Sequence, residues 1–524
     1  MLPSMLPKSV LTQGVVLGIT LMLGYALGVV WQWAWNFLEL PTPRGTTWQT
    51  VVGASYLALG LVVSVNLWRH VGWQNSLRGE FGMSQIGPTI WGFTLPLALV
   101  VSGLILIVGR SLRKLFNLFV RWFDRHLPRR LALLLGGLVF LVFVWGAWSQ
   151  VLVDGFFAGA NQLSAPVDAS TDEGITPPES TLRSGSPDSL VPWETLGRQG
   201  RNFVASGPTV DDLNAFHGGG AMESIRVYAG LKSGKTVQDR ADLVLSELIR
   251  TGAFEREALV VATTTGTGFL DTHAMDALEF VTNGDVAIAG VQYSYLPSAI
   301  SLLADVDEVR ETAQVVFEHI HEYWSDLPDA TRPDIYLYGL SLGSLGVESI
   351  LTSIDIINEP IDGALLVGPP FVNDLRNQLI LDRDPGSTPV MPVYEGGHTV
   401  RFMDESGLAQ PMTEWGDTRV VYLQHASDPV VFFSPDLLLD QPEWLTGDNR
   451  GREIDDEFRW IPFVTVWQVL TDMAVANSVP EGFGHVYTRQ AHVEAWAAIL
   501  RPEGWAAAET AALQLHLTDW RDDR

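Results

Sequence analysis

A serine between two glycines is the first candidate for chemistry in this chain. Residues 339–343 read Gly-Leu-Ser-Leu-Gly, and Ser341 follows the apolar run IYLY and precedes a helix-like run that begins at Leu342. A G-x-S-x-G turn between a buried strand and a helix holds its serine at the tip of a strained elbow, with the hydroxyl exposed. We therefore interpret Ser341 as a nucleophile; the alternative is a small residue in a glycine-rich bend.

A serine hydroxyl needs a base, and that base needs a carboxylate to orient it. In proteins with this elbow the partners follow along the chain in the order Ser, Asp or Glu, His. Asp428 comes just after the strand-like RVVYLQ, and His485 lies in the loop GFGHVY before a helix. The order predicts a catalytic triad of Ser341, Asp428 and His485. For Asp428 the alternative is turn chemistry in an Asp-Pro dipeptide.

The other histidines fit other roles. We assign His492, on the helix after the predicted base, to the surface or to packing. For His425 we prefer packing, with a supporting role beside the site as its alternative. His319 and His321 are two apart on a predicted helix and point in different directions, so they form no metal pair. The sequence contains no cysteine and no H-E-x-x-H or acidic metal loop. We expect no metal and no other cofactor.

Acyl transfer also needs backbone N–H groups that bind the negative oxygen of the tetrahedral intermediate. One donor is the residue after the nucleophile, Leu342, and the other lies in the loop after the strand two before the elbow strand. Counting back leads to the strand Ala258–Thr263 and the loop TTTGTGFLD. The donors predicted in this loop are the backbone N–H groups of Thr265, Gly266 and Thr267. The letters HGGG at 217–220 are a weaker alternative, because they precede the first strand.

These residues are positioned by alternating strand-like and helix-like runs. The strands are continuous apolar runs, as a parallel sheet covered on both faces requires. The alternation predicts a mostly parallel, doubly wound α/β sheet, with the three catalytic side chains at one rim. The predicted strands are Ser224–Tyr228, Ala258–Thr263, Val286–Gln292, Ile335–Tyr338, Ala364–Val367 and Val420–Leu423.

The first part of the chain has the composition of a membrane protein. Four segments lack ionisable residues and are long enough to cross a bilayer as helices. They are Val10–Val30, Val51–Trp68, Pro88–Val108 and Leu131–Val151. Because the spans carry no charge, they indicate an anchor and argue against an ion-coupled transporter.

The charges predict how the chain is oriented. The loop between the third and fourth spans carries seven Lys/Arg against Asp124, and the positive-inside rule places such a loop in the cytoplasm. The C-terminal domain is then extracytoplasmic, at the cell (plasma) membrane. Residues 154–524 carry 22 Lys/Arg against 57 Asp/Glu, so this part would repel phosphate, and nucleic acid is excluded as a partner.

Composition also predicts the domain boundaries. Residues 1–153 form a helical transmembrane domain, and residues 191–524 form the α/β domain. Between them, residues 154–190 are rich in Ser, Thr, Pro, Asp and Gly, as in PVDASTDEGITPPESTLRSGSPDS. Since no apolar period survives in this segment, we expect a flexible linker.

Several stretches give the chain a resemblance to a known family. They are LPSMLPKSVLTQGVV, SLVPWETLGRQGRNFV, IRVYAGL, TGTGF, VQYSYLPS, YLYGLSLGSLG and HASDPVV. The chain resembles a family of bacterial, chiefly actinobacterial, proteins with a multi-span membrane region followed by an α/β-hydrolase domain. The resemblance implies the α/β-hydrolase fold, the triad named above and one more span upstream of residue 1. It supplies no substrate.

Together these features predict a membrane-anchored serine hydrolase that faces outward. We expect it to cleave carboxylic or lipid esters through an acyl-enzyme, with the bilayer and an ester or acyl-lipid substrate as its partners; the sequence indicates no protein partner. One alternative is an envelope acyltransferase that uses the same triad. Another is a non-catalytic membrane scaffold that retains the fold.

Overall fold

The computed structural model describes residues 3–41, 45–146, 164–297, 301–302, 306–353, 356, 359–409 and 413–520. Its contacts divide the chain into two units. The helical unit comprises Met1–Phe156 and Ile454–Pro480, and the α/β unit comprises Phe157–Glu453 and Glu481–Arg524. The helical unit therefore takes a second segment, 454–480, from a region that the sequence had placed in the α/β domain.

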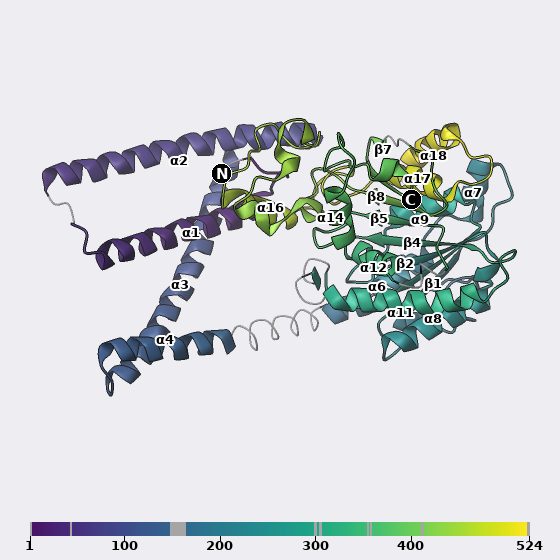
Figure 1. The fold of residues 1–524 in the computed structure, drawn as a ribbon, viewed down its shortest axis with the longest axis horizontal. Coiled ribbons are helices and arrows are strands. Elements are labelled where there is room, and N and C mark those ends of the chain that lie inside the picture. The colour runs from purple at the N-terminus through teal and green to yellow at the C-terminus, as the bar shows by residue number, and fades with distance from the viewer. Residues whose placement is uncertain are drawn as a thin grey trace. The chain divides into compact units, whose positions relative to one another are not determined.

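Long apolar helices make up most of the helical unit (Figure 1). They are α1 (Val10–Phe37), α2 (Thr46–Glu80), α3 (Trp91–Asp124, after a short turn of 3₁₀ helix at Pro88–Ile90) and α4 (Arg129–Gly146), and α16 (Val464–Met473) comes from the second segment. Four of them, α1 to α4 with that 3₁₀ turn, are long and apolar enough to cross a membrane. Their large apolar side chains are mostly exposed, which is the pattern of a helix that faces lipid. The end of the fourth predicted span, 147–151, lies outside the described residues.

The basic stretch after the third span is helical. α3 continues without a break to Asp124, and α4 begins at Arg129, so the connection between them is only 125–128. The reason is the helical spacing of its apolar residues, which include Leu115, Leu118 and Trp122 among the arginines. The basic charges therefore lie mainly on a helical extension of α3.

An eight-stranded sheet forms the centre of the α/β unit, in the order β1-β3-β2-β4-β5-β8-β6-β7. All neighbouring pairs are parallel except β6 and β7. The strands are β1 (Ile225–Ala229), β2 (Ala258–Thr263), β3 (Val286–Val291), β4 (Asp334–Leu340), β5 (Gly363–Val367), β6 (Val400–Asp404), β7 (Gly407–Leu408) and β8 (Arg419–Leu423). The mostly parallel α/β sheet is the predicted fold, and β6 and β7 are additions to the six predicted strands.

Helices cover both faces of this sheet (Figure 1). Along β4, Tyr338 belongs to one apolar core and its neighbour Leu337 to the other, because successive strand residues point to opposite faces. The first core contains residues of α6 (Gly197–Ala205), α9 (Thr272–Val281), α17 (Arg489–Leu500) and α18 (Ala507–Asp519), and the second contains residues of α8 (Val237–Thr251), α11 (Val306–Ser325), α12 (Leu342–Leu351) and α14 (Asp374–Leu381). The short helices α7 (Val210–His217) and α15 (Pro429–Phe432) lie in connections.

Part of the segment predicted as a flexible linker is folded against the sheet. The Ser184 N–H donates to the Arg226 carbonyl of β1, and the Ser184 hydroxyl accepts the N–H of Tyr228. Arg183 forms an ion pair of 3.1 Å with Glu223. The sequence predicted a flexible linker because this segment lacks a regular spacing of apolar residues. Its polar contacts nevertheless fix it to the edge strand.

Candidate active site

Ser341 occupies a strained turn between β4 and α12. Its φ of 54° and ψ of −124° lie in a region that non-glycine residues rarely adopt. The turn is held by the Ser341 N–H, which donates to the Val367 carbonyl at 2.8 Å, and by the Ser344 hydroxyl, which donates to the Ser341 carbonyl at 2.6 Å. A Cβ at Gly339 would lie 2.3 Å from the carbonyl carbon of Gly343, so the elbow closes only with glycine there.

Asp428 and His485 form a buried pair. His485 Nδ1 lies 2.6 Å from Asp428 Oδ2, and the same oxygen accepts the Tyr487 hydroxyl at 2.7 Å. The other carboxylate oxygen accepts the Val430 N–H at 2.8 Å. Burial raises the pKa of Tyr487 well above its ordinary value, so this hydroxyl stays a donor. With Asp428 as acceptor, Nδ1 carries the imidazole proton and Nε2 keeps its lone pair. Nε2 has no hydrogen-bond partner among the described residues.

The imidazole of His485 lies next to the end of β5, whose last residue binds the backbone of Ser341. Val367, the last residue of β5, accepts the Ser341 N–H, and Gly368 follows it. A Cβ at Gly368 would lie 2.6 Å from His485 Cε1, and the φ of Gly368 is +53°. No hydrogen bond joins Ser341 Oγ to His485 Nε2 among the contacts of the described residues; in enzymes such bonds often tighten only when substrate binds. The structure thus brings all three side chains to the carboxyl ends of the neighbouring strands β4, β5 and β8.

The loop after β2 borders the elbow. β2 pairs with β4, and a Cβ at Gly343 would lie 2.3 Å from the Thr263 carbonyl oxygen. Leu342 is the first residue of α12, so its N–H has no acceptor within the helix. In the loop, the N–H of Gly266 and that of Thr267 have no hydrogen-bond acceptor in the described part of the chain.

Two of the sequence-based oxyanion candidates do not fit this geometry. The Thr265 N–H donates to the Phe269 carbonyl at 3.1 Å, because the loop closes on itself as a turn, and it is therefore not free to bind an oxyanion. The HGGG stretch begins at His217, the last residue of α7, and the nearby Met222 N–H bonds to the Asn283 carbonyl just before β3. These glycines therefore lie at the amino ends of the strands, away from the elbow.

Comparison with protein families identifies the second unit. Residues 225–513 match the model described as Alpha/beta-hydrolase family, which covers more than half of the chain. The chain belongs to the alpha/beta-hydrolase family. Residues 1–208 of this hydrolase match the model of the Alpha/beta-hydrolase family N-terminus, so the long helices and the sheet belong to one family architecture. No curated protein and no solved structure matches the chain.

A second histidine supports the loop that carries His485. His425 Nδ1 lies 2.9 Å from the Gly484 carbonyl, and its Nε2 lies 2.9 Å from Glu405 Oε1. Its ring stacks on Tyr487 with 4.1 Å between the centroids. From the sequence we preferred a packing role for His425. The structure shows that it contacts the residue before His485. The only signal for this in the sequence was its position three residues before Asp428.

Three further side chains of the same cluster, Ser427, Glu453 and Glu405, were missed from the sequence. The Ser427 hydroxyl accepts the Gly484 N–H at 2.9 Å and donates to Glu453. Glu405 also accepts the Thr488 N–H at 3.2 Å, just after the loop. The backbone on both sides of His485 is therefore fixed by side chains from two distant segments.

The other three histidines considered from the sequence form hydrogen bonds with backbone carbonyls. The buried His492 forms a hydrogen bond of 2.7 Å with the Thr488 carbonyl, as expected for a packing residue. His319 and His321 bind the backbone carbonyls of Val315 and Glu359. Among the described residues, no cluster of three or more His, Cys, Asp or Glu could hold a metal ion.

The His425 cluster makes stability depend on pH. Burial alone would lower the pKa of His425, but the hydrogen bond to Glu405 and the charges of Glu453 and Glu405 raise it above its ordinary value of 6.5. Because the pKa is higher in the folded state, the charged ring stabilises the fold fully below pH 6.5, and this contribution is lost as pH rises through the folded-state pKa. We expect the difference in unfolding free energy between the wild type and His425→Gln to shrink as pH rises from about 6 to about 9.

Thermal unfolding of the full chain in detergent at a series of pH values measures this difference. His492→Gln is the matched control, because burial lowers the pKa of His492 and its loss should not produce the same trend. A wild-type advantage over His425→Gln that stays constant across this range would contradict the prediction.

Proposed function

We propose that this hydrolase is a membrane-anchored serine esterase that cleaves carboxylic esters, including acyl lipids, through an acyl-enzyme. The observation that carries the proposal is the pairing of His485 Nδ1 with Asp428, which leaves Nε2 without a hydrogen-bond partner among the described residues. The imidazole lies beside Gly368, which follows the β5 residue whose carbonyl binds the Ser341 N–H. A serine, a base and an orienting acid in this order are the requirements of nucleophilic acyl transfer.

The reaction would proceed in two steps. Ser341 Oγ attacks the ester carbonyl carbon while its proton moves to His485 Nε2, and Asp428 stabilises the imidazolium. The negative oxygen accepts hydrogen bonds from the N–H groups of Leu342 and of Gly266 or Thr267; one such donor contributes about 10²- to 10³-fold to kcat. The imidazolium then protonates the leaving alcohol. Water, activated by the same imidazole, cleaves the acyl-enzyme and releases the acid.

Labelling with a fluorophosphonate probe tests the nucleophile. We expect the full chain in detergent to be labelled, the labelled peptide to contain Ser341, and Ser341→Ala to remain unlabelled. Ser349→Ala, a serine of α12 about two turns further on, is the matched control and should label like the wild type. A wild-type protein that the probe leaves unlabelled while it is folded would favour a non-catalytic scaffold.

The proposed site faces outward from the cell membrane. One observation supports this side: the basic residues between Arg110 and Arg130 follow the third apolar span. The positive-inside rule places these residues in the cytoplasm, and the fourth span then leads the chain outward. A charged, membrane-impermeant fluorophosphonate should therefore label Ser341 in intact cells. Labelling that requires prior permeabilisation would place the hydrolase on the cytoplasmic side.

A further inference from the structure

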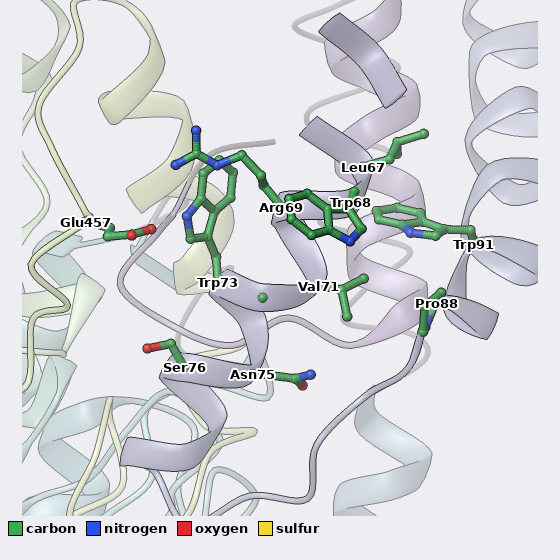
Figure 2. Close-up of a pocket in the computed structure, with 11 residues that line it drawn as sticks. Leu67, Trp68, Arg69, Val71, Trp73, Asn75, Ser76, Pro88, Trp91 and Glu457 are labelled. Carbon is green, nitrogen blue, oxygen red and sulfur yellow. The ribbon is translucent and has the colours of Figure 1, made fainter. Parts of the chain in front are cut away.

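The helical unit contains an apolar cavity at the end of an apolar span (Figure 2). Its volume is about 670 Å³, within the range of small-molecule sites. Its lining includes Leu67, Trp68, Arg69, Trp73, Trp91 and Glu457. A second cavity of about 280 Å³ shares Arg69, Trp73 and Glu457 with it and adds Pro3, Arg459 and Ile461. The two cavities therefore form one site with a larger apolar part and a smaller charged part.

The position of the site along the chain sets its depth in a bilayer. Arg69 is the first charged residue after the apolar run of α2, and Pro88 opens the apolar run of the next helix. Consecutive spans begin and end at the same surface, so both ends lie where hydrocarbon gives way to headgroups. Trp68 and Trp91, one from each helix, are the residue type that anchors helices at this level.

The lining of the site carries more positive than negative charge. The Arg69 guanidinium lies 5.2 Å from the ring centre of Trp73, which Figure 2 shows beside it. Neither Arg69 nor Arg459 forms an ion pair with any residue that the structure describes. Glu457 is the only carboxylate among the described lining residues of the two cavities. Two guanidinium groups against one carboxylate leave a positive site, and guanidinium binds phosphate in bidentate fashion.

The apolar part of the site opens towards lipid. In α2 none of the apolar 18-residue window is buried, and Trp68 is 78% exposed. An acyl chain that entered between Trp68 and Trp91 could continue along this bare face of α2 into the hydrocarbon. A soluble ligand would leave that face uncovered, whereas a lipid covers it.

We propose that this site binds one phospholipid of the surrounding bilayer. Its phosphodiester lies at Arg69 and Arg459, and one acyl chain lies against Leu67, Trp68 and Trp91. The proposal depends on membrane insertion and on these side chains, and it is independent of the chemistry at Ser341.

Native mass spectrometry of the full chain tests the proposal, with phosphatidylglycerol as the probe and diacylglycerol as the probe without phosphate. We expect one phosphatidylglycerol to remain bound at detergent concentrations that remove other lipids, and diacylglycerol to be lost. The double variant Arg69→Gln/Arg459→Gln should weaken phosphatidylglycerol binding at least tenfold. Arg113→Gln/Arg121→Gln, with the same change in charge on the extension of α3, is the matched control and should bind like the wild type.

Three outcomes would overturn the proposal. If the Arg69→Gln/Arg459→Gln variant retains the lipid, the arginines do not form the site. If the control variant loses the lipid equally, phosphatidylglycerol is held by general electrostatic attraction to basic residues. If diacylglycerol binds as tightly as phosphatidylglycerol, the lipid is held by apolar contacts alone. Fluorophosphonate labelling of each variant shows separately whether the α/β unit is intact, so a failure here is distinguishable from a failure of the proposed esterase.

Discussion

Replacement of Asp428 by asparagine should lower kcat for a short-chain ester by about 10⁴-fold, with KM close to the wild-type value. The carboxylate accepts hydrogen bonds from His485, Tyr487 and Val430. An asparagine amide turned towards the ring donates to Nδ1, which moves the imidazole proton to Nε2. The base then has no lone pair for the Ser341 proton, although the elbow and the oxyanion donors are unchanged. Steady-state hydrolysis by the purified full chain measures the effect.

Tyr487→Phe provides the comparison for this variant. Its hydroxyl donates to the same carboxylate oxygen, so the change removes a neighbour of Asp428 but leaves the 2.6 Å contact with His485. We expect a loss of about tenfold, the size of one hydrogen bond to a charged group. If Asp428→Asn keeps more than about one-tenth of the wild-type kcat, Asp428 is not the residue that orients the base. An equal loss in both variants would point to a structural role for the whole cluster.

The sheet was predictable because its central strands are buried on both faces. Ala258–Thr263 and Val286–Val291 read as continuous apolar runs, and their partners in the sheet are other strands of the same kind. The strands at the far edge carry a different signal. β6 and β7 are joined by a polar turn that contains Glu405, and β7 has only two residues, so the local pattern indicates a loop. They become strands because β8 offers β6 a partner.

The same difference separates the predicted from the missed parts of the site. Ser341, Asp428 and His485 each sit at the end of a strand or before a helix, so their positions followed from the order of elements. The support of His485 depends on contacts between segments far apart in sequence: Glu405 reaches His425 across 20 residues, and Tyr487 reaches Asp428 across 59. No local pattern encodes such an approach. The prediction of Thr265 as an oxyanion donor was wrong for a local reason, because its N–H donates to the Phe269 carbonyl within the turn.

Residues 454–480 show what composition alone misses. They lie in the chain between Asp428 and His485, and the sequence placed them in the α/β domain, yet they belong to the helical unit. α16 reads VTVWQVLTDM, an apolar helix with Asp472 as its only charge. A single carboxylate in such an apolar helix indicates a buried partner of opposite charge. That partner is Lys8, more than 460 residues away in the sequence.

Replacement of Asp472 by alanine should destabilise the helical unit by about 3–5 kcal/mol, because it leaves a buried ammonium without its counter-ion. Lys8 Nζ pairs with Asp472 Oδ1, the Met5 N–H donates to Oδ2 at 3.0 Å, and both charged side chains are buried. Hydrogen–deuterium exchange of α16 in the full chain should show faster exchange in Asp472→Ala than in the wild type. The double variant Lys8→Met/Asp472→Leu removes both charges and keeps apolar volume, so it should recover most of the protection. If the single and double variants exchange equally fast, the loss arises from packing or from the Met5 hydrogen bond, and the ion pair does not hold the two segments together.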